Sequence, residues 1–305
     1  MTTPASSRRR RSWRPLLLSL ALLAVAAVLL PVVAGSADDG RPPTQAAGRN
    51  PHAGSASDVG MEHVHGLGVN PADGLLYAAS HFGVFRLDDG TATRMGNLQD
   101  TMGFTVVGPD TFLASGHPDF AEDDEPLLGL VQSSDAGRTW APLSLRGEAD
   151  FHALQFEHGR VWGYDSTSST FMATEDRRTW QRLSRLALRD FAVSARDPDV
   201  VVATTGRGVG RSEDGGLTWQ EVRGAPALVV VDAGRQVLVG VDREGVVHVS
   251  DDDGRTWSAR GTTGAAPDAL TLSGEDGARV FVAVSDGRIV ASDDQGRTFT
   301  SVYEP

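Results

Sequence analysis

Imidazole side chains are concentrated between residues 63 and 152, where five of the eight histidines of this chain lie. Neutral imidazoles with nearby carboxylates suit zinc or copper(II), and the chain has no cysteine that could add a thiolate. His65 is preferred over His63 because its context, His-Gly-Leu, matches the His-Ala-Leu of His152, so both side chains should project alike. We therefore predict one divalent transition-metal site formed by His65, His81, His117 and His152. The alternative is that these histidines only form hydrogen bonds in a polar opening.

The histidines lie in a repeated sequence that begins near Glu62. An eight-residue pattern, Ser-x-Asp-x-Gly-x-Thr followed by Trp or Phe, occupies 133–140, 212–219, 250–257 and 292–299. A fifth copy, at 174–180, is one residue short and lacks the glycine. The closing aromatic residues fall at 140, 180, 219, 257 and 299. A period near 40 with strand-like segments indicates sheets repeated around an axis rather than a helical array.

The aspartate of each copy suits a structural turn. Its carboxylate can accept hydrogen bonds from the backbone of its own loop, and the glycine supplies the positive φ that such a turn needs. An active site is needed once, whereas this residue recurs in every copy, so catalysis and calcium binding are less favoured interpretations. The predicted structural aspartates are Asp135, Asp176, Asp214, Asp252 and Asp294.

Over residues 62–303 the pattern resembles the Asp-box (BNR) repeat of sialidase-like β-propellers, whose secreted or membrane-anchored bacterial members are often called glycosyl hydrolases. The resemblance implies an all-β, six-bladed β-propeller with each box between the third and fourth strands of a blade, opposite the ligand face. Functional residues should then lie at inner-strand starts and in loops between second and third strands, because loops carry function on rigid scaffolds. In phase with the boxes, innermost strands are expected to begin near Val64, Gly103, His152, Phe191, Leu228 and Ala269.

The resemblance also implies one enzymatic chemistry, exo-acting glycoside hydrolysis of the sialidase type. Such an enzyme needs arginines for the substrate carboxylate, a tyrosine–glutamate nucleophile pair and an aspartic general acid. The Arg-Ile-Pro segment of true sialidases is absent, however, and the chain has only three tyrosines. We therefore favour a non-catalytic propeller that binds a glycan, a peptide or a protein partner at its mouth. The residues that the hydrolase alternative would use are Arg189, Arg207, Arg243, Arg288, Glu244 and Tyr164.

The N-terminal segment has the composition of a signal peptide or a transmembrane anchor. Four arginines at 8–11 precede an uncharged apolar run at 16–33, which is just long enough to cross a bilayer. The arginines favour a cytoplasmic N-terminus, so the rest of the chain should be extracytoplasmic, either secreted or anchored to the cell membrane. The expected organisation is a signal peptide or anchor over 1–35, a flexible linker over 36–60 and the propeller over 61–305.

The charge of the chain excludes nucleic acid as a partner. All 28 basic residues are arginine, and five of them lie in the first 14 positions, which leaves 23 against 40 acidic residues. Nucleic-acid binding needs clustered positive charge to neutralise phosphates. The expected partners are the membrane, through an uncleaved N-terminal segment, and a glycan or protein ligand at the propeller mouth.

Overall fold

The structure is a computed structural model that describes residues 60–119, 125–274 and 277–305. The predicted signal or anchor segment 1–35, and the predicted linker up to residue 59, lie outside the described residues. Within the described ranges, no helix is long and apolar enough to span a membrane.

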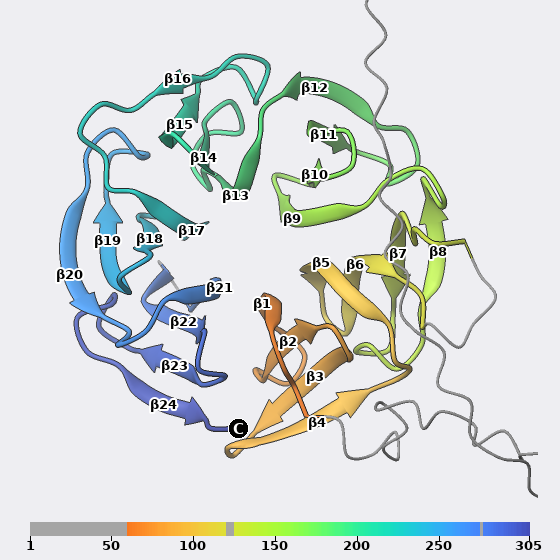
Figure 1. Ribbon diagram of the computed structural model, residues 1–305. Helices are drawn as coiled ribbons and strands as arrows, with labels where there is room; N and C mark the ends of the chain where they lie inside the picture. Colours follow the sequence, from red (N-terminus) through yellow and green to blue (C-terminus); the bar gives the residue numbers. More distant parts are fainter. Residues whose placement is uncertain (1–59, 120–124, 275–276) are drawn as a thin grey trace, which may run out of the picture. The chain divides into compact units, whose positions relative to one another are not determined.

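The described residues form a six-bladed β-propeller, which confirms the predicted all-β architecture (Figure 1). Each blade is an antiparallel sheet of four consecutive strands, and no strand exchange between sheets is seen in the described part of the chain. Blade 1 contains β1 (Val64–Val69), β2 (Leu76–Ser80), β3 (Gly83–Asp88) and β4 (Thr91–Met95). Blade 2 contains β5 (Asp100–Gly108), β6 (Thr111–His117), β7 (Leu130–Ser133) and β8 (Ala141–Ser144). Blade 3 contains β9 (Phe151–Glu157), β10 (Arg160–Asp165), β11 (Thr170–Thr174) and β12 (Gln181–Arg185). Blade 4 contains β13 (Leu188–Val193), β14 (Val201–Thr205), β15 (Gly208–Ser212) and β16 (Gln220–Glu221). Blade 5 contains β17 (Leu228–Ala233), β18 (Leu238–Asp242), β19 (Val246–Ser250) and β20 (Ser258–Thr262). Blade 6 contains β21 (Pro267–Ser273), β22 (Arg279–Val284), β23 (Ile289–Ser292) and β24 (Thr300–Tyr303).

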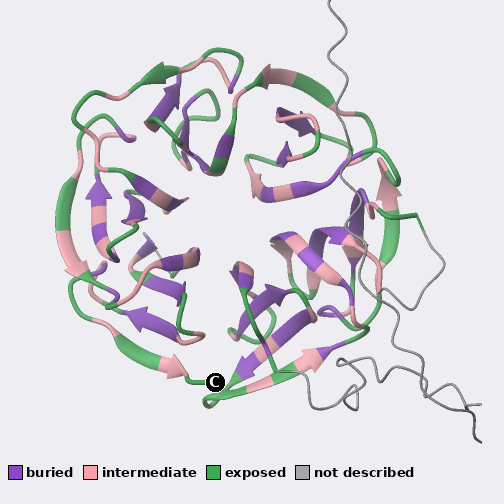
Figure 2. Cartoon of the chain, in the orientation of Figure 1, coloured by how far each residue is buried: buried purple, intermediate pink, exposed green. Residues whose placement is uncertain are grey.

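Burial changes from the middle of each blade to its rim (Figure 2). Every residue of β2 and β11 is buried, whereas both residues of β16 are exposed. A blade has neighbours on both faces, so its central strands are continuous apolar runs rather than alternating ones. The sequence of β14, Val-Val-Ala-Thr-Thr, is typical of such a strand.

The repeated Ser-x-Asp-x-Gly-x-Thr-Trp segments form the turns between third and fourth strands, the position that the resemblance implied. In the turn after β19, Asp252 accepts hydrogen bonds from the Ser250 hydroxyl at 2.8 Å, from the Thr256 N–H at 2.8 Å and from the Thr256 hydroxyl at 2.6 Å. The glycine of this turn, Gly254, has φ 81° and frees the chain to reverse. The same three kinds of hydrogen bond surround Asp135, Asp214 and Asp294. In the short fifth copy, Asp176 accepts hydrogen bonds from the Thr174 hydroxyl and the Thr179 N–H.

Candidate functional site

Each inner strand carries a β-bulge near its start, on the side of the blade nearest the centre of the propeller (Figure 1). In every blade the register with the second strand skips one residue at this place. A bulge redirects one side chain out of the alternating pattern of a strand, and bulges are common beside functional sites. The skipped residues are His65, Met102, His152, Arg189, Val229 and Asp268.

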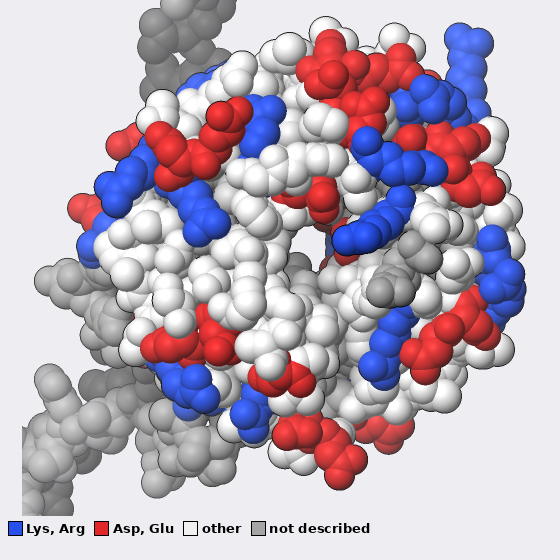
Figure 3. All heavy atoms as spheres, turned by 180° about the vertical axis from the view of Figure 1, so that it is seen from behind, with Lys and Arg blue, Asp and Glu red and all other residues white. Residues whose placement is uncertain are grey.

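Five of these six residues, all except Val229, line a central cavity of about 360 Å³. Small residues beside the bulges let adjacent inner strands approach closely. A Cβ on Gly103 would lie only 2.4 Å from the backbone oxygen of Phe151, so a side chain is excluded there. On the face opposite to that of Figure 1, acidic and basic side chains are interspersed around a central opening (Figure 3).

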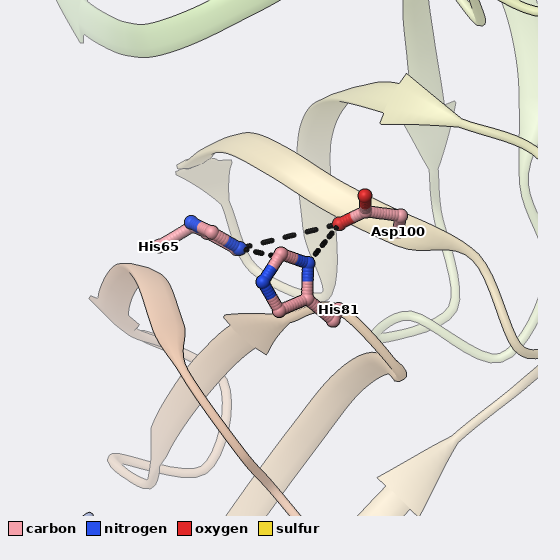
Figure 4. A group of neighbouring side chains, drawn as sticks. All are labelled: His65, His81 and Asp100. Atoms are coloured by element: carbon pink, nitrogen blue, oxygen red, sulfur yellow. Dashed lines mark hydrogen bonds and ion pairs between the residues drawn. The ribbon is translucent and has the colours of Figure 1, made fainter. Parts of the chain in front are cut away.

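Two of the predicted ligands, His65 and His81, meet a carboxylate of the next blade (Figure 4). His65 Nε2 lies 3.3 Å from His81 Nδ1, and His81 Nδ1 lies 2.9 Å from Asp100 Oδ1. The third side of this triangle, from His65 Nε2 to Asp100 Oδ1, is 4.0 Å. Zinc binds nitrogen at about 2.0–2.1 Å, so neighbouring ligand atoms of a tetrahedral ion lie about 3.3 Å apart. The three atoms are therefore close enough to share one ion.

The other two predicted ligands, His117 and His152, both contact a second carboxylate, that of Asp150, and His117 also contacts Asp100. His117 Nδ1 is 3.5 Å from Asp100 Oδ2, and its Nε2 is 3.9 Å from Asp150 Oδ2. His152 Nε2 is 2.7 Å from the same oxygen of Asp150. The four predicted histidines therefore lie around two carboxylates, Asp100 and Asp150, and His117 contacts both.

Sequence reasoning gave none of Asp100, Asp150 and His63 a role in the metal site. Asp100 and Asp150 each stand two residues before a bulge, a shared position that becomes visible only after the bulges are known. The ring of His63 lies 4.8 Å from that of His65, and its Nδ1 is 3.4 Å from Asp268 Oδ2. Choosing His65 over His63 by its position in the repeat could not reveal this contact, because Asp268 belongs to the last blade.

The environment keeps His65 uncharged. Burial is the main reason that its pKa falls to about 3, and the neighbouring rings of His81 and His63 lower it further. Asp150 is held in the opposite state: burial opposes ionisation, but hydrogen bonds from His152 and Ser166 leave its pKa below the usual value. A neutral imidazole offers a lone pair and an ionised carboxylate offers charge, and these are the forms that metal ions bind.

The residues of the hydrolase alternative are dispersed. Within the described chain, Arg189 is the one member of this set that lines the central cavity. Tyr164 is only 6% exposed and packs in an apolar cluster with Trp162 and Phe171, where a substrate has no access. The others occupy turns between second and third strands: Arg207 in blade 4, Arg243 and Glu244 in blade 5, and Arg288, which is paired with Asp286, in blade 6.

Comparison with known proteins supports the fold. The sequence matches no family model and no curated protein sequence. Among solved structures, 1234 chains match, so the fold by itself selects no function. A chain of the nidogen/laminin complex is 13% identical, with a TM-score of 0.60, and the match covers 76% of this chain and 93% of that one. YCF48 bound to D1 peptide is 15% identical, with a TM-score of 0.50, and covers 79% of this chain and 81% of that one.

Proposed function

We propose that this propeller is a binding module that holds a divalent transition-metal ion at its mouth, between blades 1 and 2. The observation that carries this proposal is the convergence of His65, His81 and Asp100, whose ligand atoms lie within 4.8 Å of one another. Two imidazoles and a carboxylate suit zinc or copper(II). Three protein ligands also leave a coordination position open for water or an incoming ligand.

Hydrogen bonding in this cluster depends on the tautomer of His81. If His81 Nδ1 carries a hydrogen for Asp100, it has no lone pair to offer His65. If it instead accepts a hydrogen from His65, its lone pair faces the carboxylate oxygen at 2.9 Å. A bound cation would instead accept the lone pairs of both neutral rings and the carboxylate oxygen together.

The ligand of the module is proposed to be a protein, peptide or glycan segment that reaches the open position. Two solved structures of similar fold are a nidogen/laminin complex and YCF48 bound to D1 peptide. In this chain the cavity beside the metal site is lined by polar residues such as Arg189 and Asp268, which suit a ligand with charged groups. A sialidase-type hydrolase has less support, because its tyrosine lies in the core.

We further propose an extracytoplasmic location, on the basis of the arginines at 8–11 and the apolar run at 16–33. A reporter enzyme that is active only outside the cytoplasm, fused after residue 305, tests this proposal. Activity that requires residues 1–35 supports it, and equal activity without them contradicts it.

Titration calorimetry of the metal-free full chain with zinc and with copper(II) tests the metal site. We expect binding by the unmodified protein and a loss of at least about tenfold in affinity in Asp100→Asn and His81→Gln. His248→Gln is the matched control, because His248 lies 2.8 Å from Asp242 in blade 5, where the described residues place no third ligand. Absence of binding by the unmodified protein, or equal affinity in all four proteins, contradicts the proposal.

A further inference from the structure

The contact between His81 and Asp100 recurs one blade further around the propeller. Ser80 pairs with Val64 across β1 and β2, and Gly116 pairs with Thr101 across β5 and β6, so His81 and His117 hold equivalent positions after these residues. Each of these histidines contacts the aspartate two residues before the bulge of the next blade, Asp100 in one case and Asp150 in the other.

The third member of the group comes from a different blade in the second copy. In the first copy it is His65, the bulged residue of the same blade as His81. The equivalent residue in the second copy is Met102, which is a poor ligand for zinc. Its place is taken by His152, the bulged residue of the blade that supplies Asp150, at 2.7 Å from the carboxylate.

The carboxylate of Asp150 has an unused oxygen. Its side chain is 6% exposed, and Oδ2 accepts hydrogen bonds from His152 and from the Ser166 hydroxyl at 3.0 Å. Oδ1 is buried and has no hydrogen-bond partner among the described residues. An unpaired charged oxygen in the protein interior is costly, and a coordinated cation satisfies it.

We propose that His117, Asp150 and His152 form a second divalent-metal site, so that the mouth of this propeller binds two ions. Asp150 supplies its carboxylate, and the imidazoles supply Nε2, which lies 3.9 Å from Asp150 Oδ2 in His117 and 2.7 Å in His152. The two imidazole side chains are 35% and 37% exposed. His117 also links the two sites, since its other nitrogen, Nδ1, faces Asp100 at 3.5 Å. This inference extends the proposed function, but the second site has ligands of its own.

The number of zinc ions bound per chain tests the inference. Metal-free full chain is equilibrated with excess zinc and freed of unbound metal, and the zinc content is measured by mass spectrometry alongside titration calorimetry. We expect two ions in the unmodified protein, one in Asp150→Asn, one in Asp100→Asn, and two in Asp242→Asn, which breaks the His–Asp pair of blade 5. Circular dichroism melts confirm folding, and His152→Gln replaces Asp150→Asn if that variant fails to fold.

The outcomes separate this inference from the proposed function. One ion in the unmodified protein, lost in Asp100→Asn and kept in Asp150→Asn, overturns the second site and leaves the first in place. One ion that is kept in Asp100→Asn and lost in Asp150→Asn overturns the first site alone. An unmodified protein without zinc overturns both, and two ions that persist in Asp150→Asn and in His152→Gln place the second ion elsewhere.

Discussion

At the scale of single residues, two aspartates join the inner strands of neighbouring blades. Asp190 of β13 accepts a hydrogen bond from the Val231 N–H of β17 at 2.9 Å. Asp232 of β17 accepts one from the Leu272 N–H of β21 at 2.8 Å. Both line the central cavity, and burial raises the pKa of Asp190 to about 6 and that of Asp232 to about 7.

The raised pKa of Asp232 predicts a pH-dependent stability. The folded protein binds this proton more tightly than the unfolded chain, whose aspartate titrates near pH 4, so the associated stability is present below about pH 4. It is lost as the pH rises through about 7. The free energy of unfolding is measured with urea at pH 5 and at pH 8. From pH 5 to pH 8 it should fall more in the unmodified protein than in Asp232→Asn. Parallel pH profiles for the two proteins would contradict this account of Asp232.

The residues at the mouth show what sequence reasoning can and cannot find. The repeat phase placed His65 and His152 at equivalent positions, and the structure shows that both are bulged residues. The phase did not single out Asp100, because its role depends on a contact with His65, 35 positions earlier in another blade. It also could not show which histidine contacts which aspartate, since spacing along the chain does not give distances between blades.

At the scale of the element, the repeated turn is a local unit whose aspartate holds the loop together. We expect Asp252→Ala to lower the free energy of unfolding by roughly 1–2 kcal/mol, because three hydrogen bonds to the carboxylate are lost. Chemical denaturation measures this change. The neighbouring Asp251→Ala is the control, since that side chain is exposed and should change stability little. Equal effects of the two substitutions would show that the hydrogen bonds contribute nothing.

The strands and these turns were the most predictable elements. A recurring turn of fixed length fixes the position of the strands on both sides, so the expected and observed inner strands begin at the same residue or within three of it. The bulges were not predicted, because a bulge is defined by its pairing partner on the adjacent strand and not by its own residue type.

At the scale of the whole molecule, blades 1 and 6 close the ring by side-chain packing. Their shared cluster includes Leu67 and Phe85 of blade 1 and Phe281 and Ile289 of blade 6. Since no strand is exchanged within the described residues, this junction should resemble the others in strength. Closure therefore depends on shape and apolar contact.

Substitution in two such clusters tests this account of closure. Ile289→Ala at the junction of blades 1 and 6, and Leu238→Ala between blades 4 and 5, should each lower the free energy of unfolding by about 2–5 kcal/mol. Both side chains are almost fully buried. A negligible cost for Ile289→Ala, with a large one for Leu238→Ala in the same denaturation experiment, would mean that ring closure does not depend on this packing.

The central claim is that the mouth of the propeller binds a transition-metal ion between blades 1 and 2. Anomalous scattering at the zinc absorption edge, from crystals of the full chain grown with zinc, tests it most directly. The account predicts a peak at about 2.0–2.2 Å from His65 Nε2, from His81 Nδ1 and from a carboxylate oxygen of Asp100. A map with no peak in the mouth, or with zinc bound only at unrelated surface residues, would contradict it.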